Sequence, residues 1–240
     1  MADLKEPFIK IRNVRKVYKM GTEKVVALDN VSLDIYRGEF VCFLGKSGSG
    51  KSTFLNMVAG LEKPTSGEIV IGKIHIESLS EEEITLFRQK NIGFIFQAYQ
   101  LIPSLNAVEN VALPLIFRGI PSTEAQKLAK KQLDNVGLKG FYNRKPSQMS
   151  GGQQQRVGIA RALVNKSKII FADEPTGNLD SNTTIDVMNI ILDISRKNNQ
   201  TIILVTHDNS IAEYADKIVE IKDGNIINIV QKGTKHEIQE

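Results

Sequence analysis

Apolar and polar positions follow strand-like patterns in several short segments along the chain. Residues 8–11 and 31–35 alternate, as strands with one buried face do. The run EFVCFLG at 39–45 is almost continuously apolar, as expected of a strand buried on both faces. Residues 68–71 and 92–97 predict two more strands. Together these segments predict a sheet whose first strand begins near residue 8.

Helical spacing replaces the strand pattern from about residue 98. Ser150 predicts the N-cap of a helix, and Thr123 with Gln126 has the spacing of a capping box. We therefore expect a helical subdomain at 98–160, inserted in a single domain (1–240) whose core comprises 1–97 and 161–240. The predicted buried positions of its helices are Leu128, Ala129, Leu133 and Val136, then Val157, Ala160, Leu163 and Val164.

Strand patterns resume at 168–174 and 201–208, with a helical stretch at 181–196 between them. This alternation is typical of βαβ units and predicts a parallel sheet. Residues 217–230 predict a closing hairpin with its turn at Asp223-Gly224. Near the other end, Ser80 and Glu83 have capping-box spacing before another helix. The fold class expected is α/β.

Composition narrows the class of protein. The 240 residues are 41% hydrophobic, which suffices for a core, and the net charge is only +4. The basic residues are scattered, so we expect a solvated mixed-charge surface and no nucleic-acid partner. The single cysteine, Cys42, is expected in the core. No apolar run approaches the roughly 20 residues that cross a bilayer, and the first residues lack an apolar signal core, so any membrane connection is expected through a partner.

The segment GKSGSGKS at 45–52 fits the phosphate-binding loop G-x-x-x-x-G-K-[ST], between a predicted strand and a predicted helix. Its glycines let backbone N–H groups approach phosphate oxygens without a Cβ clash, and the helix start adds a positive dipole. Lys51 is expected to reach the β- and γ-phosphates. The Ser52 hydroxyl suits Mg²⁺, which prefers oxygen ligands.

Two acids end the buried run IIFADE at 169–174. Asp173 is placed at the carboxyl end of its strand, where open α/β sheets bind ligands, and can hold Mg²⁺ through water. Glu174 points the other way if the chain is still extended, and can polarise a water aimed at the γ-phosphate. Without the phosphate loop the pair could merely cap a strand; with it, the two acids are its expected partners.

The stretch SGGQQQRV at 150–157 predicts a second anion site. Ser150 caps a helix whose start carries partial positive charge, and the glycines permit close backbone approach. One subunit has no evident use for two γ-phosphate sites, whereas two subunits arranged head to tail would use both.

This stretch resembles the signature motif of ABC-type ATPases, and the family's other motifs follow in order. They are Walker A at 45–52, Gln97 after FIF, Walker B ending at Asp173-Glu174, GNLD at 177–180, and His207. FQAYQLIPSLNAVENVALPL and DEPTGNLD resemble the branch of macrolide-export and lipoprotein-release ATPases and their cell-division relative. The resemblance implies a P-loop NTPase with a RecA-like, mostly parallel sheet core, an antiparallel β subdomain and an inserted α-helical subdomain.

The resemblance also implies the site. Two copies would sandwich two ATP molecules, with Glu174 and His207 catalytic and His207 contacting the γ-phosphate. Asp180 would link the two sites, and Tyr18 would stack on adenine. The Mg²⁺ contacts implied are Ser52, Gln97 and Asp173. The nucleotide contacts implied are Tyr18, Gly45, Lys46, Ser47, Gly48, Ser49, Gly50, Lys51, Ser52, Thr53, Gln97, Ser150, Gly151, Gly152, Gln153 and Asp180.

The leading hypothesis is a transporter ATPase subunit, peripheral on the cytoplasmic face of the membrane. A separate permease would dock near 99–120, where apolar residues mix with Pro103, Pro114 and, just beyond, Pro121. Ordinary irregular packing is the alternative interpretation of that segment. The same ATPase could instead drive a cell-envelope enzyme or sensor without moving a solute. A soluble nucleic-acid machine is disfavoured, because the chain lacks the sustained heptad pattern that would form a long inserted coiled coil.

Overall fold

The computed structural model describes residues 6–232, so part of the chain's opening segment lies outside the described residues. Contacts divide the chain into two compact units. The first unit takes in the chain up to Leu79 and again from Thr201, and the second spans Ser80–Gln200. No helix of the described residues is both long and apolar enough to span a bilayer.

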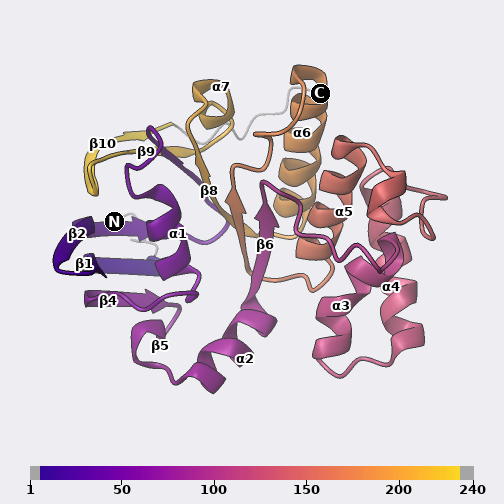
Figure 1. Ribbon diagram of the computed structural model, residues 1–240, viewed down its shortest axis with the longest axis horizontal. Coiled ribbons are helices and arrows are strands. Elements are labelled where there is room, and N and C mark those ends of the chain that lie inside the picture. The colour runs from indigo at the N-terminus through magenta and orange to yellow at the C-terminus, as the bar shows by residue number, and fades with distance from the viewer. Residues whose placement is uncertain (1–5, 233–240) are drawn as a thin grey trace, which may run out of the picture. The chain divides into compact units, whose positions relative to one another are not determined.

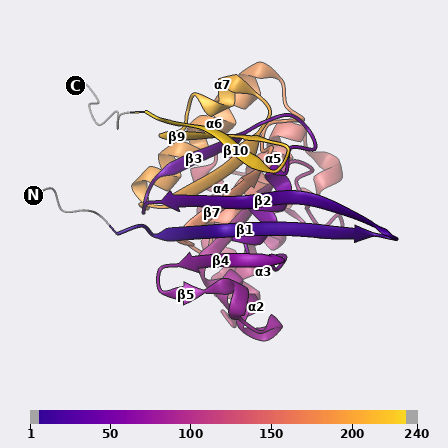
Figure 2. The same ribbon diagram turned by 90° about the vertical axis from the view of Figure 1, so that its left-hand side faces the viewer.

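The first unit contains an antiparallel sheet of four strands in the order β2-β1-β4-β5, whose three longer strands lie side by side in Figure 2. Its core side chains include Ile9, Ile11 and Val14. The short helix η1 follows β5. The bounds are β1 (Ile9–Met20), β2 (Glu23–Ile35), β4 (Ser66–Ile71), β5 (Ile74–His75) and η1 (Ile76–Ser78).

Strands β1 and β2 are far longer than the expected 8–11 and 31–35. The reason is a bulge in each strand: the β1–β2 register shifts between Ile11 and Val14, beside Asn13 (φ 50°) on β1, and again between Val14 and Lys16, opposite Asn30 (φ 55°) on β2. An extra residue breaks the period-2 alternation on which the sequence-based prediction depended. The strand therefore continues after its hydrophobic pattern stops predicting one.

The remaining strands of this unit run in the order β10-β9-β3-β8. β3 pairs in parallel with both β8 and β9, and β10 is antiparallel to β9, as predicted. Asp223 (φ 48°) and Gly224 (φ 76°) form the hairpin turn, and both positive angles suit a type I′ turn. The bounds are β3 (Phe40–Leu44), β8 (Thr201–Thr206), β9 (Lys217–Lys222), β10 (Asn225–Gln231), α1 (Lys51–Val58) and α7 (Asn209–Ala212).

The second unit joins a parallel strand pair, β6 with β7, to most of the helices. Figure 1 shows α3 and α4 as neighbouring helices, and both contact α5. No strand occurs between residues 97 and 168, all of which the structure describes, so the switch to helix was predicted correctly. The bounds are α2 (Glu81–Asn91), β6 (Ile92–Phe96), α3 (Ala107–Phe117), α4 (Ser122–Asn135), η2 (Pro146–Gln148), α5 (Gly151–Leu163), β7 (Ile169–Asp173) and α6 (Ser181–Lys197).

Helix caps test the local predictions. Ser80 forms the expected capping box, and Ser150 is the expected N-cap, with Gln153 completing a box that was not predicted. The box at Thr123 is wrong, because α4 begins at Ser122 with Pro121 as its N-cap, two residues before the cap that was predicted. Leu128 was also misplaced: it is 40% exposed, whereas Ala125 takes a buried position on α4. The other predicted positions are buried except Val164, which is half-buried.

Candidate functional site

The phosphate-binding loop connects β3 to α1 within the first unit. Two of its glycines are required by their surroundings: a Cβ on Gly50 would lie 2.5 Å from the carbonyl oxygen of Ala27, and one on Gly45 would collide with the carbonyl oxygen of Ile221. Gly50 also has φ 102°, a conformation that L side chains rarely adopt. The loop therefore presents bare backbone at the start of α1.

Lys51, the first residue of α1, is 5% exposed and folds back over the loop. Its ammonium group donates to the carbonyl oxygens of Gly45 (2.7 Å) and Lys46 (2.8 Å). The Ser49 hydroxyl is buried beneath the loop, and its oxygen has no hydrogen-bond partner among the described residues. A buried cation and an unsatisfied hydroxyl at one loop give it capacity for an anionic ligand.

Strand pairing brings His207 to this loop. Leu44 at the end of β3 pairs with Thr206 at the end of β8, and the Gly45 N–H donates to the Thr206 carbonyl (3.3 Å). His207 is the next residue and is exposed. The carboxyl ends of two neighbouring parallel strands thus hold the loop and the histidine together, at the edge where open α/β sheets bind ligands.

Tyr18 lies on β1 with its hydroxyl donating to Glu62 (2.7 Å). Burial and this carboxylate raise the pKa of the tyrosine, and a hydrogen bond with Thr53 acts in the opposite direction. Thr53 is in the first turn of α1, so the ring is near the loop. The Lys16 ammonium lies over one face of the Tyr18 ring, 5.0 Å from the ring centre. The opposite face of the ring is the one left for stacking.

In the second unit, Gln97 and the acidic pair follow paired strand ends. Phe96 pairs with Asp173 across β6 and β7, so Gln97 and Glu174 leave the same edge. Glu174 has φ 42°, so the chain is not extended there and the simple alternation of side chains predicted for Asp173 and Glu174 does not apply. A Cβ on Gly177 would lie 2.8 Å from Gln97 Nε2, which places GNLD against this glutamine.

The start of α5 is built as the sequence indicated. Ser150 Oγ accepts from the Gln153 N–H (3.3 Å), and Gln153 Oε1 accepts from the Ser150 N–H (3.1 Å). A cavity of about 280 Å³ opens here, lined in part by Ser150, Gly152, Gln153 and Arg156. A capped helix start beside an arginine favours an anion.

The first turn of α6 packs against the first turn of α5. Asp180 is the N-cap of α6 and accepts from the Thr183 N–H (3.0 Å) and hydroxyl (2.6 Å). These bonds lower the pKa of Asp180. The Thr183 methyl in turn lies where a Cβ on Gly152 would fall. Asp180, Thr183 and Gly152 therefore form one packed junction.

The residues that brace these motifs were not predicted from the sequence. Arg161 donates to the carbonyl oxygens of Tyr99 (2.8 Å) and Gln100, two residues with positive φ. Burial lowers the pKa of Arg161. Gln155 is fully buried and donates to the Pro175 carbonyl beside Glu174. The sequence around a helical arginine or glutamine does not indicate a hydrogen-bond partner tens of residues away. The only available clue was that both residues lie on a helix predicted to be buried on one face.

Comparison with known proteins identifies the family. The profile of the ABC transporter family matches residues 28–177. The chain is 47% identical over 222 residues to the uncharacterized ABC transporter ATP-binding protein MJ0796 of Methanocaldococcus jannaschii, covering 91% of this chain and 94% of that one. The chain belongs to the ABC transporter family. The structure solved for a dimeric, post-hydrolysis state of MJ0796 bound to ADP and Pi has a TM-score of 0.87, with 46% identity, 93% coverage of this chain and 98% of that one.

Two further relatives extend the comparison. The macrolide export ATP-binding/permease protein MacB of Wolinella succinogenes is 43% identical over 93% of this chain, which spans only 34% of that longer protein. CbiO1 of Clostridium perfringens, part of the ABC transporter complex cbiONQ, has a TM-score of 0.84 at 28% identity, covering 94% of this chain and 89% of that one. The chain is therefore an ABC ATPase: an ATP-binding subunit with the α/β cassette fold that its sequence predicted.

Proposed function

We propose that two copies of this ABC ATPase bind two ATP molecules head to tail. Each nucleotide would lie between the phosphate loop of one copy and Ser150–Gly152 of the other. The observation that carries the proposal is that one chain has two helix starts suited to an anion, the capped start of α5 and the glycine loop before α1. The solved relative MJ0796 is dimeric with ADP and Pi, which supports this arrangement.

The first unit fits a nucleotide. Lys51, now bonded to two loop carbonyls, would exchange them for phosphate oxygens, and the buried Ser49 hydroxyl has no partner of its own among described residues. Tyr18 near α1 would stack on adenine through its open face. The remaining loop residues, including Ser47 and Gly48, would offer backbone N–H groups.

Ser52, Gln97 and Asp173 would hold Mg²⁺, which supplies charge compensation at the phosphates when bound. The described residues contain no cluster of three or more His, Cys, Asp or Glu side chains suited to a metal. A site of one carboxylate, one hydroxyl and one amide oxygen fits Mg²⁺ nevertheless, because this ion commonly takes its other ligands from substrate phosphates and water.

Glu174 would act as the general base that orients the attacking water, and His207 would contact the γ-phosphate. Asp180 would link the two sites across the interface between the copies, and Gln153, within the signature, would contact the nucleotide. The positive φ of Glu174 and the buried Gln155 bond to Pro175 fix the backbone at this base. A base held by its backbone keeps its carboxylate in place without any large movement.

A transmembrane permease would dock near 99–120, with the chain peripheral on the cytoplasmic face. Three apolar side chains of this segment are exposed: Phe117 by 67%, Ile102 by 41% and Ile116 by 38%. Transport, such as export or the handling of a lipoprotein- or peptide-type substrate, is proposed over the purely mechanical alternative, and the name of the relative MacB, a macrolide export protein, supports export. The scattered charge supports the absence of a nucleic-acid partner.

Glu174→Gln tests the proposal, because it keeps the shape of the side chain and removes the base. We expect MgATP to bind and turnover to fall about 100-fold or more. Light scattering should then show an ATP-dependent shift from monomer to dimer. The exposed Glu213→Gln is the matched control and should behave as the unsubstituted protein. Turnover near normal in Glu174→Gln would place the base elsewhere, and a monomer at saturating MgATP would refute the shared sites.

A further inference from the structure

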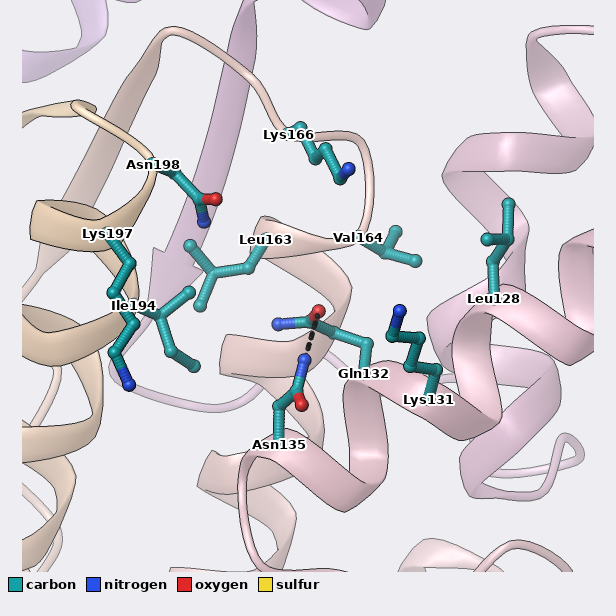
Figure 3. A pocket seen from close by; sticks show the side chains of 10 residues that line it. All are labelled: Leu128, Lys131, Gln132, Asn135, Leu163, Val164, Lys166, Ile194, Lys197 and Asn198. Carbon is teal, nitrogen blue, oxygen red and sulfur yellow. Dashed lines mark hydrogen bonds between the residues drawn. The ribbon is translucent and has the colours of Figure 1, made fainter.

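A cavity of about 280 Å³ lies in the second unit, and none of its lining residues is assigned to ATP. Helices α4, α5 and α6 and the residues that follow α5 and α6 form its walls, as Figure 3 shows. Every lining residue comes from this unit. They are Leu128, Lys131, Gln132, Asn135, Leu163, Val164, Lys166, Ile194, Lys197 and Asn198.

The charge of this cavity is positive and unbalanced. Lys131, Lys166 and Lys197 line it from three different segments, and none of the ten lining residues is acidic. Across the described part of the chain, no hydrogen bond or ion pair engages any of these three ammonium groups. Elsewhere on the same unit a cation does find a partner: the half-buried Arg156 pairs with the exposed Asp186 at 3.2 Å. Three unpaired cations around one hollow favour an anion.

An unsatisfied donor points to the same conclusion. Gln132 Nε2 is buried and has no hydrogen-bond partner among the described residues. The orientation of this amide is fixed by Asn135, whose Nδ2 donates to Gln132 Oε1 (3.3 Å). Figure 3 shows the Gln132 side chain reaching from α4 into the middle of the cavity, with its nitrogen toward Ile194. A buried amide N–H without a partner is costly, so an acceptor in the cavity would be stabilised.

The rest of the wall is apolar. Leu163 is fully buried at the base, and Val164 and Ile194 are half-buried beside it. Leu128 is 40% exposed at the rim, which explains why this α4 residue departs from the predicted buried stripe. A volume of about 280 Å³ is just below the usual range of roughly 300–1,000 Å³ for ligand sites and suits a small molecule.

We propose that this cavity is a binding site for a small organic anion. Its phosphate or carboxylate group lies among Lys131, Lys166 and Lys197 and accepts from Gln132 Nε2. Its apolar part lies against Val164 and Ile194. Such a ligand contacts α4 and α6 at once, and therefore restrains the helix of the predicted helical subdomain relative to the helix that Asp180 caps.

Phenyl phosphate is a suitable probe, since it joins a phosphate to a ring small enough for the cavity. Titration calorimetry in saturating MgADP would keep the phosphate loop occupied. We expect a dissociation constant on the order of 1 mM. The variant Lys131→Gln/Lys166→Gln/Lys197→Gln should bind about tenfold more weakly or worse, while Lys90→Gln/Lys127→Gln/Lys139→Gln, with the same loss of exposed charge, should change affinity by less than about twofold.

Hydrogen exchange on the unsubstituted protein gives a second measurement that needs no variant. Phenyl phosphate should slow exchange at 131–135 and 194–198. Equal weakening in both triple variants, or absence of this protection, would overturn the proposal. Inorganic phosphate binding as tightly as phenyl phosphate would refute the apolar half of the site. Capture on phosphatidylglycerol vesicles through the same lysines, without phenyl phosphate binding, would refute a soluble ligand. None of these outcomes depends on ATP turnover.

Discussion

Gly152 lies against Thr183, so that a Cβ on the glycine would fall 2.6 Å from the threonine methyl carbon. Thr183 also gives Asp180 both of its capping hydrogen bonds. The two helix starts that carry the signature and GNLD are thus joined through one glycine and one threonine. Their alignment is set by packing, since a methyl group leaves no room for any side chain at 152.

Gly152→Ala should therefore destabilise the protein by about 1 kcal/mol, because overpacking at Thr183 exceeds the gain in helix propensity. Thr183→Ser removes the methyl and keeps the hydroxyl bond to Asp180. Thermal unfolding of the single and double variants measures the coupling. We expect Gly152→Ala/Thr183→Ser to recover much of the loss; an additive double variant would show that the contact is not the cause.

Lys51→Ala should weaken ATP binding by about tenfold or more, since the buried ammonium is the loop's own charge for phosphates. The loop carbonyls of Gly45 and Lys46 also lose their donor. Fluorescent-nucleotide titration gives the affinity, and the exposed Lys24→Ala is the charge control. An unchanged dissociation constant would mean that the loop is not the phosphate site.

Arg161→Lys should lower stability although the charge is kept, because lysine lacks the fork that reaches both Tyr99 and Gln100 carbonyls. Losing one or both bonds costs about 1–2 kcal/mol, and residues 98–103 should become easier to cleave. Limited proteolysis with mass spectrometry reports the cleavage sites. Arg118→Ala, on an exposed arginine, is the control. Cleavage at the normal rate would show that Arg161 does not hold this segment.

Cys42 offers a pH prediction. Complete burial raises the pKa of its thiol to about 12 from an ordinary 9.0. An acid whose folded pKa is raised stabilises the fold below its unfolded pKa, and that contribution is lost as pH rises from about 9 to 12. The denaturation midpoint should thus fall over this range, and less so in Cys42→Ala.

Thiol chemistry checks the same environment. A disulfide reagent at pH 8 should react with Cys42 at least about 100-fold more slowly in the folded than in the unfolded protein, because only the exposed thiolate attacks. Rapid labelling of the folded protein would contradict the burial of β3.

Local features were predictable because their causes are local. A capping box needs only residues i and i+3, so Ser80 and Ser150 were correctly predicted as caps. Thr123 failed since Ser122 starts α4 directly after Pro121, whose ring presets φ, and no side-chain cap is used. Fully buried strands such as β3 and β7 showed as apolar runs, whereas the bulge at Asn13 hid most of β1.

The sequence by itself determined the family, the phosphate-loop motif, the signature cap and the positions of the buried strands along the chain, since each depends on spacing within a few residues. Only the tertiary structure decided the reach of β1 and β2, the bracing of Tyr99 by Arg161, the contact of Gly152 with Thr183 and the lysine-lined cavity. These depend on side chains from distant segments meeting in space. Packing and electrostatics at such meetings are set by the folded backbone, and no local pattern encodes them.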